Sequence, residues 1–299
     1  MRITVAIATL GRPQDLGQAL RDLGRQTRRP DSVIVSATGP DDIDAESVAQ
    51  CCAPVEVLIG PKGLTRQRNL VLDRLGQAEI VLFLDDDFVM ADDFLQALNS
   101  LFTRCPDVAV ATGHVLADGI GSAGLTPHQA RVILDGAQTS DDDGLVRVNN
   151  GYGCNMAFRT APIAENALRF DETLPLYGWL EDVDFSRRVA AHGRCVKSLT
   201  LRGVHLGTKA GRTSGVKLGY SQVANPLYLM RRATMRPGHA LRLLGGNMLA
   251  NAAKSLRPEP WVDRRGRLRG NLTALADLMR GRMHPRRILM MEGAVDDTP

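Results

Sequence analysis

Over its first hundred residues, the chain alternates short apolar runs rich in β-branched residues with segments whose apolar residues recur at helical spacing. The predicted strands are residues 3–9, 33–35, 55–59 and 80–84, and the predicted helices are residues 16–23, a segment around Val48, and residues 64–75 and 95–102. Strands separated by helices form βαβ units with parallel strands and right-handed crossovers. The pattern therefore predicts an α/β fold, whose ligands bind at the carboxyl ends of strands.

The remaining two thirds of the chain is less regular. Residues 118–146 are rich in Gly and Asp and predict an irregular excursion with a short helix at 128–134. A glycine-led strand is predicted within 149–159, a helix at 182–191 and a strand at 196–199. From Pro226 the chain is predicted to be helical, basic and amphipathic, with breaks at Pro237, Pro258, Pro260 and Pro285.

The composition is that of an ordinary folded protein. Hydrophobic residues make up 44% and charged residues 23%, which argues against disorder and coiled coil. No apolar run approaches the ~18 residues of a membrane-spanning helix, and the opening MRITVAIATLGRP is too quickly polar for a signal peptide. The five cysteines have no zinc-binding spacing and predict reduced thiols. We therefore expect a cytoplasmic protein, without membrane spans or disulfides.

Charge is distributed unevenly along the chain. The net charge is +4, but the residues from Arg202 onward contain 18 Lys and Arg against 6 Asp and Glu, a net of +12. The first 201 residues then contain 19 against 27, a net of −8. This polarity indicates an acidic catalytic part and a basic tail with an anionic neighbour. Phosphates, a membrane surface and nucleic acid all fit that description.

Three consecutive carboxylates, Asp85, Asp86 and Asp87, directly follow the fourth predicted strand. Adjacent carboxylates repel one another, and a divalent cation with oxygen ligands removes that repulsion. Such a cation commonly completes its coordination with substrate phosphates and water. The structural alternative is an acidic turn or helix start.

Glu181 and Asp182 stand at the start of a predicted helix, directly after the segment Gly178-Trp179-Leu180. A carboxylate here can take a proton from an acceptor hydroxyl, although acids also stabilise a helix start through its dipole. Trp179 offers an aromatic face to a sugar, or else an anchor against the core.

Weaker signals lie on either side of these acids. Arg66 and Arg68, in the segment GLTRQRN, suit a phosphate or nucleotide edge or serve as surface arginines. His205 is a candidate metal ligand or a packed histidine. The phosphate-loop pattern, the dinucleotide-binding GxGxxG and the GxSxG elbow are absent from the sequence. ATP hydrolysis, dinucleotide redox chemistry and serine hydrolysis therefore lose their main support.

Taken in order, these segments resemble a family-two glycosyltransferase. The matching motifs are VAIATLGRP, GLTRQRN, IVLFLDDD, GYGCNMAFR, GWLEDVDFSRR and VHLG. They cover about residues 1–210, and their joint order is far more specific than any single motif. The tail segment RGRLRGNLTALADLMRGRMHPRRI is also similar, more loosely, to C-terminal segments of bacterial family-two enzymes that build surface polysaccharides.

The resemblance implies a GT-A fold, a Rossmann-like, mainly parallel mixed sheet flanked by helices. It implies a catalytic domain over residues 1–225, with a nucleotide-binding half at about 1–112 and an acceptor half at about 113–225, followed by a helical extension at 226–299. The implied activity is inverting transfer of a sugar from a nucleotide-diphosphate sugar to an acceptor hydroxyl, with Mn²⁺ or Mg²⁺. The implied setting is bacterial cell-surface or exopolysaccharide synthesis.

The resemblance also assigns residues to roles. Asp85 lies near the ribose, and Asp87 lies on the metal that bridges the diphosphate. Asp182 is the general base, and Glu181 orients it or the acceptor. The implied nucleotide contacts are Thr9, Arg12, Thr38, Arg68, Asn69, Asp85 and Asp86, the metal ligands are Asp87 and His205, and the sugar and acceptor contacts are Gly151, Gly153, Asn155 and Trp179.

One stretch departs from the family pattern. The family commonly has acids at the end of the second strand, one of which reads the nucleotide base. Here that stretch is Ser36-Ala37-Thr38-Gly39-Pro40, and Asp41 and Asp42 follow only later. Either Thr38 takes the role or Asp41 reaches back to it. The identity of the base is left open.

Two other functions compete with glycosyl transfer. A sugar-1-phosphate nucleotidyltransferase also places acids beside a nucleotide, but it needs a Gly-rich basic loop after the first strand, of which ATLGRPQDL is only a remnant. A non-enzymatic protein that binds nucleic acid or an anionic surface would use the basic tail. Aromatic residues make up only 4% of the chain, so base stacking is unsupported and we expect no nucleic-acid partner.

The tail itself allows several partners. Residues 240–244, which include Arg242, and residues 275–279, which Arg280 follows, bring apolar residues together with arginines, which favours peripheral contact with an anionic membrane at the cytoplasmic face of the inner membrane. A lipid-linked saccharide acceptor follows as a hypothesis. The alternatives are a helical cap on the catalytic domain and a homodimer interface.

Overall fold

The computed structural model describes residues 1–137, 144–209 and 213–291, which form two compact units. The first unit contains Met1–Lys62, Arg66–Phe170 and the segment that begins at Phe185. The second contains Gly63–Thr65, Asp171–Asp184 and the chain after residue 212. Part of the predicted excursion (138–143) and the end of the predicted extension (292–299) lie outside the described residues.

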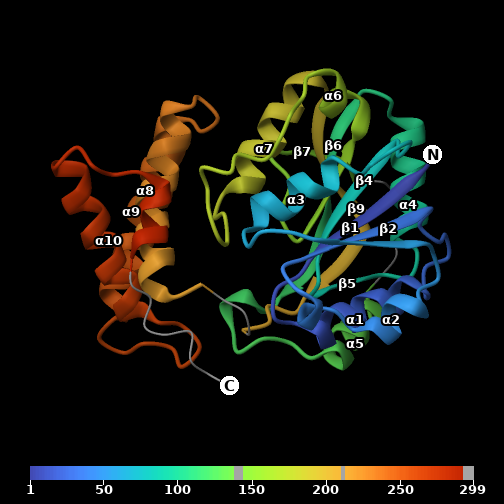
Figure 1. Cartoon of the computed structure of the whole chain (residues 1–299), viewed down its shortest axis with the longest axis horizontal. Helices are drawn as coiled ribbons and strands as arrows, with labels where there is room; N and C mark the ends of the chain where they lie inside the picture. The colour runs from blue at the N-terminus through green and yellow to red at the C-terminus, as the bar shows by residue number, and fades with distance from the viewer. Residues whose placement is uncertain (138–143, 210–212, 292–299) are drawn as a thin grey trace. The chain divides into compact units, whose positions relative to one another are not determined.

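The first unit is built on a nine-stranded mixed sheet with the order β3-β2-β1-β4-β8-β6-β9-β5, and β7 also pairs with β9 (Figure 1). Neighbours among β3, β2, β1 and β4 are parallel, as are β6 and β9, whereas β8 runs antiparallel between β4 and β6. The strands are β1 (Ile3–Ala8), β2 (Ser32–Ala37), β3 (Val55–Ile59), β4 (Ile80–Asp85), β5 (Phe88–Met90), β6 (Val108–Asp118), β7 (Val146–Arg147), β8 (Asn155–Arg159) and β9 (Arg194–His205). The α/β class of the sequence analysis is confirmed.

Helices cover both faces of this sheet because its inner strands are apolar on both sides. In β1, Val5 and Ile7 face one apolar cluster with α1 and α4, while Ala6 faces a second cluster with α3 and α7. Figure 1 shows α3, α6 and α7 on the side of the sheet opposite α1. The helices of this part are α1 (Pro13–Leu23), α2 (Ala45–Ala49), α3 (Leu64–Leu72), α4 (Phe94–Arg104), α5 (Pro127–Asp135), α6 (Thr160–Glu165) and α7 (Glu181–Val189).

The predicted elements of the first hundred residues are confirmed within a few residues, but later strands differ from prediction. β5, β6 and β7 were not expected, and β9 is three times as long as the predicted strand. In β6 and β9 the reason lies in packing, because polar residues such as Thr112 and Ser198 are buried there by pairing between the two strands. A periodicity of apolar residues cannot reveal strands of this kind.

The second unit contains α8 (Gly215–Arg231), α9 (Pro237–Lys254), α10 (Arg264–Met279) and the short 3₁₀ helix η4 (Pro285–Met290). The helical region thus begins earlier than predicted, and α8 continues through Pro226. α8 and α10 approach closely at two glycines. A Cβ on Gly219 would lie 2.1 Å from the Arg267 carbonyl oxygen, and one on Gly270 would lie 2.1 Å from the Val216 carbonyl oxygen.

Buried amides join the same three helices. Asn251 of α9 donates to the side chains of Gln222 in α8 and Asn271 in α10, at 2.8 and 2.9 Å. Asn271 in turn donates to the Gly219 carbonyl at 2.7 Å. Such bonds fix the helices in one register, because a buried amide left without a partner is costly. None of the described helices is long and apolar enough to cross a membrane.

Candidate active site at the ends of strands β1, β4 and β9

The turn between β4 and β5 brings the three aspartates beside the end of β9, because β5 pairs with β9. Asp85 is the last residue of β4 and pairs with Ala8 of β1, so the loop after β1 lies beside the three aspartates. Phe88 of β5 pairs with His205, the last residue of β9. Backbone bonds tighten this junction, since the Leu206 amide donates to the Asp87 carbonyl at 2.9 Å.

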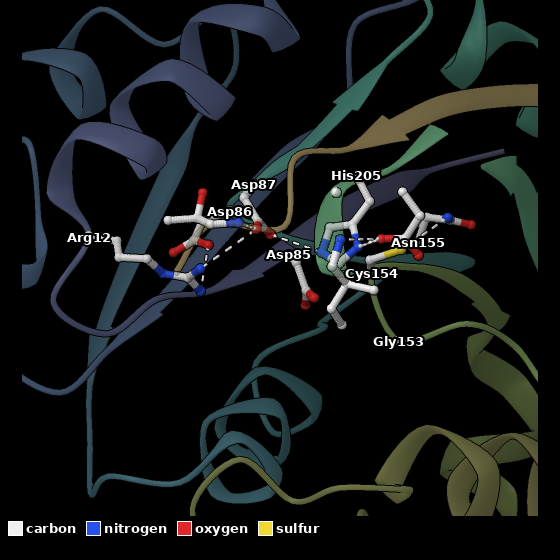
Figure 2. A network of polar contacts seen from close by, with 12 residues as sticks. Arg12, Asp85, Asp86, Asp87, Gly153, Cys154, Asn155 and His205 are labelled. Atoms are coloured by element: carbon white, nitrogen blue, oxygen red, sulfur yellow. Dashed lines mark hydrogen bonds and ion pairs between the residues drawn. The ribbon is translucent and has the colours of Figure 1, made fainter. Parts of the chain in front are cut away.

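Asp85, Asp87 and His205 form a cluster in which one potential ligand atom from each lies within 4.8 Å of the others. The Nε2 atom of His205 is 3.4 Å from Asp87 Oδ1, and Figure 2 shows the imidazole and this carboxylate directed toward each other. The Asp87 and His205 side chains are 4% and 7% exposed, whereas that of Asp85 is 28% exposed.

This donor set fits a divalent cation. Two carboxylates and one imidazole nitrogen are ligands that Mn²⁺ and related cations accept. The opposite oxygen of Asp87 accepts a hydrogen bond from the Thr208 amide at 2.8 Å, which leaves Oδ1 on the side of His205. Without a cation, burial would raise the pKa of Asp87, but the hydrogen bond and positive charge of His205 hold it below its usual range.

His205 is itself held by a second carboxylate. Its Nδ1 atom lies 3.0 Å from Oδ1 of Asp118, and the other oxygen of Asp118 accepts a hydrogen bond from the Tyr152 hydroxyl at 2.7 Å. Burial favours a lower pKa for His205, but its bonds to Asp118 and Asp87 raise the pKa to about 10. Burial also opposes ionisation of Asp118, yet the bonds from His205 and Tyr152 lower its pKa to about 2.

Asp86 points away from this cluster and binds the loop after β1. Its Oδ2 accepts a bond from the Thr9 hydroxyl at 2.8 Å, and its Oδ1 forms an ion pair with Arg12 at 2.7 Å (Figure 2). Burial raises the pKa of Asp86 to about 7, despite the positive charge of Arg12. Arg12 also lies 3.8 Å from Asp87, so it places a cation beside two of the three aspartates.

Arg68 lies at the other side of Asp85 and is only 2% exposed. Its guanidinium donates to the Gly153 carbonyl at 2.9 Å and to Asp85 at 3.3 Å, and stacks against Phe83 and Phe170. The neighbouring Asn69 bonds through both ends of its amide to the backbone of Phe170. Arg68 therefore fixes the carboxylate of Asp85, and Asn69 holds the backbone around Phe170.

The end of β2 is closed by Asp42, a residue to which the sequence assigned no role. Its carboxylate accepts bonds from the Gly11 amide at 2.6 Å, from the Thr38 amide at 2.8 Å and from the Thr38 hydroxyl at 2.7 Å. Asp41 is exposed, and contact of its side chain with the nucleotide base stays a prediction. Because Asp42 is the last residue of a short 3₁₀ turn, η1 (Pro40–Asp42), its side chain returns toward the strand end.

The predicted sugar and acceptor residues of the β7–β8 segment lie among backbone contacts. Asn155 is 1% exposed, and its side-chain oxygen accepts bonds from the Gly113 amide at 2.5 Å and the Thr112 hydroxyl at 3.0 Å. The Gly151 amide donates to the Ser186 hydroxyl, and a Cβ on Gly151 would lie 2.9 Å from that of Met156. These residues shape the backbone beside the cluster.

Glu181, Asp182 and Trp179 belong to the second unit. Glu181 is 5% exposed, whereas Asp182 is partly exposed. The turn before them is strained, because the non-glycine residue Leu180 has a φ of +74°. The Trp179 carbonyl accepts a bond from the Asn225 amide at 2.7 Å, which fixes this turn to α8.

Three positions around the cluster were missed from the sequence: Asp118, Tyr152 and Asp42. Asp118 sits at the end of the unpredicted strand β6, where register places it opposite His205. Tyr152 lay within a recognised motif, GYGCNMAFR, but only its glycines and asparagine were assigned roles.

Solved structures with the same fold include several glycosyltransferases. S. aureus TarS 1-349 in complex with UDP-GlcNAc is 16% identical, with 96% of this chain and 83% of that chain covered and a TM-score of 0.55. The mannosyltransferase PcManGT from Pyrobaculum calidifontis, in complex with GDP-Man and Mn²⁺, is 17% identical, with 97% and 85% covered and a TM-score of 0.52. GalNAc-T7 with UDP, GalNAc and Mn²⁺ is 13% identical, with 93% and 56% covered and a TM-score of 0.55. At these identities the likeness establishes the fold, and it is the GT-A fold.

Sequence comparison establishes the family. No curated protein matches the chain. A family model described as glycosyl transferase family 2 matches residues 4–164, which is more than half of the chain and includes most of β1 and the three aspartates at the end of β4. The chain therefore belongs to glycosyl transferase family 2 and is an enzyme of that type.

Proposed function

We propose that this enzyme transfers a sugar from a nucleoside-diphosphate sugar to an acceptor hydroxyl, with a divalent cation held by Asp85, Asp87 and His205. The observation that carries the proposal is the convergence of these three side chains at the ends of β4 and β9. Ligands of open α/β sheets bind at such strand ends. PcManGT and GalNAc-T7, which share the fold, were solved with a nucleotide or nucleotide sugar and Mn²⁺, which supports the same donor class here.

The residues around the cluster supply the remaining donor chemistry. Arg12 places positive charge beside Asp86 and Asp87, where a diphosphate would lie. When bound, the cation stabilises negative charge on the departing nucleoside diphosphate. The imidazole of His205 favours Mn²⁺ over Mg²⁺, because Mg²⁺ prefers oxygen ligands. Arg68 keeps the carboxylate of Asp85 in position for the cation and the ribose.

On the acceptor side, we assign proton removal to Asp182 and orientation of that carboxylate or the acceptor to Glu181. Three features support this choice: the resemblance of GWLEDVDFSRR to the family motif, the partial exposure of Asp182, and the strained turn that precedes it. A hydroxyl becomes a competent nucleophile as a base takes its proton. Attack opposite the leaving group, without a covalent intermediate, gives inversion at the sugar. Trp179 offers an aromatic face for the sugar or acceptor.

The acceptor we propose is a saccharide or lipid-linked saccharide hydroxyl in the synthesis of a bacterial surface polysaccharide. The support is the similarity of the basic C-terminal segment to segments of enzymes that build such polymers. The corresponding location is the cytoplasm, at the inner face of the membrane.

Thermal unfolding in the presence of nucleotides tests the donor site. We expect one of UDP, GDP and dTDP to raise Tm only when Mn²⁺ or Mg²⁺ is present, because ligands that bind the folded state stabilise it. Asp87→Ala should lose the metal-dependent part of this rise. A variant that keeps the whole rise would remove Asp87 from the metal site.

The released product then separates the two enzyme classes. With a nucleotide sugar and an acceptor, glycosyl transfer releases a nucleoside diphosphate. Release of pyrophosphate from a nucleoside triphosphate and a sugar phosphate would instead identify a nucleotidyltransferase. Anomeric configuration of the product, measured by NMR, decides between inversion and retention.

A further inference from the structure

One side of helix α9 is apolar and exposed. Leu241 and Leu249 are 56% and 73% exposed, and Gly245 and Ala252 are exposed at three- and four-residue spacings on the same face. Leu256, just after the helix, is 82% exposed. The opposite side of α9, with Ala240 and Asn251, faces the helical core. We call this exposed side, from Leu241 to Leu256, the α9 stripe.

The α9 stripe continues into a hollow beside α10. This hollow has a volume of about 700 Å³ and is lined by Ser255, Leu256, Arg265, Leu268, Arg269, Leu272, Thr273 and Ala276. Leu272 is 56% exposed. The hollow therefore combines an apolar floor with two guanidinium groups at its edge.

Basic residues surround this surface with few acids to neutralise them. Residues 213–291 contain 15 Lys and Arg against 3 Asp and Glu. Each acid is already engaged: Glu259 with Lys254 and Arg264, Asp277 with Arg282 and Arg287, and Asp263 with the Gly266 amide at the start of α10. Among the described residues, Arg242, Arg257 and Arg269 have no acid within ion-pair distance.

The combination of exposed leucines and unneutralised arginines decides which partner could cover this surface. A second copy of the chain would bring like charges together, because a two-fold interface places the same patch on both sides. Duplex nucleic acid would neutralise the arginines but would offer nothing to the exposed leucines. An anionic lipid surface satisfies both, since leucines enter the boundary between headgroups and acyl chains while arginines contact the headgroups. The 18 residues of α9 give a flat contact about 27 Å long.

We propose that the α9 stripe and the adjoining α10 hollow form a docking surface for an anionic membrane, with Leu241, Leu249 and Leu256 inserted at the interface. Arg242, Arg265 and Arg269 contact anionic headgroups around them. The surface would hold the enzyme at the membrane although none of the described helices can span one. It is independent of the transfer chemistry, so its test needs no donor or acceptor.

The test is co-sedimentation of the full-length protein with vesicles. One set contains phosphatidylcholine and about one third phosphatidylglycerol, and the other contains phosphatidylcholine alone. We expect binding to the anionic vesicles that weakens with salt. Arg265→Gln with Arg269→Gln should weaken it about 25-fold, because each arginine near an anionic surface contributes about a 5-fold effect. Leu249→Ser with Leu256→Ser should weaken it tenfold or more.

Matched controls lie on the first unit. Arg29→Gln with Arg104→Gln removes two exposed arginines there, and Val132→Ser changes a side chain that is 58% exposed on α5. These controls should bind vesicles like the wild type, and unfolding curves should show that every variant is folded. Circular dichroism serves that purpose.

Four results would overturn the proposal. The first is that the protein does not bind anionic vesicles, and the second is that the control variants weaken binding as much as the test variants do. The third is that the double leucine variant and the double arginine variant both bind like the wild type. The fourth is that sedimentation velocity shows a dimer that Leu249→Ser dissociates. Tight binding of duplex DNA that competes with vesicles and is unaffected by the leucine changes would assign the arginines to nucleic acid instead.

Discussion

Replacing Asp118 tests whether the carboxylate behind His205 controls metal binding. Asp118 accepts one bond from the imidazole at 3.0 Å and one from the Tyr152 hydroxyl at 2.7 Å. A carboxylate in this position fixes the ring orientation of a metal-binding histidine and raises its basicity. Loss of such a partner costs about 10- to 100-fold in metal affinity, or roughly 1.4–2.7 kcal/mol.

The structure predicts an order among variants. Asp118→Ala removes both bonds and should show the full loss, while Asp118→Asn keeps an oxygen that can accept from Nδ1 and should lose less. Tyr152→Phe leaves the carboxylate in place and should lose least. His205→Ala removes the proposed ligand itself, so its loss of metal affinity should be larger than that of the other three variants.

Mn²⁺ titration followed by electron paramagnetic resonance measures this directly, without donor or acceptor. Asp107→Asn is the matched control, because it removes an exposed carboxylate that pairs only with Arg194 among the contacts found for it. If Asp118→Ala binds Mn²⁺ as tightly as the wild type and the control, then Asp118 does not position a metal ligand. A loss equal in all variants, including Asp107→Asn, would equally refute the reasoning.

Three further changes test other parts of the molecule. Asp182→Asn should lower turnover by about 10²–10⁴-fold with donor affinity unchanged, and unchanged release of nucleoside diphosphate would exclude Asp182 as the base. Burial opposes ionisation of Asp42, but bonds from Gly11 and Thr38 hold its pKa below the usual value. The ionised carboxylate of Asp42 therefore contributes its full stabilisation of the folded protein above pH ~4, and this contribution is lost as the pH falls through the lower folded-state pKa. Asp42→Asn should lower the unfolding free energy by about 1.5–3 kcal/mol at neutral pH. Urea melts of both proteins should show that this difference becomes smaller in acid, and a difference that stays the same would contradict the prediction. Gly270→Ala should lower the unfolding free energy of the helical unit by about 1–3 kcal/mol or more, since its Cβ would meet backbone atoms. Gly246→Ala, with open space around it, is the control, and equal melts for the two would be inconsistent with a close α8–α10 approach.

The sequence predicted the parts of the fold that depend on local apolar patterns. β1 and β4, and the acids at the end of β4, follow from apolar runs that are buried on both faces, whereas β3 follows from a shorter apolar run in a partly exposed edge strand. β6 begins with an apolar run at 108–111, but Gly113 and His114 interrupt its pattern, and only pairing with β9 shows that the strand continues to Asp118. The consequence for the site was that Asp118, at the end of β6, received no role.

The direction in which a side chain points was equally hard to predict from the sequence. Asp41 and Asp42 are adjacent and chemically identical, yet only Asp42 turns back to Thr38, because a 3₁₀ turn directs its side chain inward. The motif assigned Asn155 to the sugar and acceptor region, but it could not show that the side-chain oxygen of Asn155 accepts a bond from the Gly113 amide of β6. Such distinctions depend on the direction of a side chain, which the one-dimensional pattern does not contain.

Because β9 pairs on both its edges, binding of the proposed cation would report on the alignment of this strand. β9 lies between β6 and β5, and His205 is its final residue. A slip of one residue would turn the imidazole to the other face of the sheet and present Val204 in its place. Molecules that fold with this misalignment would keep much of their secondary structure but would not bind Mn²⁺. Metal affinity chromatography of a refolded sample would therefore separate molecules with the correct β9 register from molecules with a shifted register, before any activity is measured.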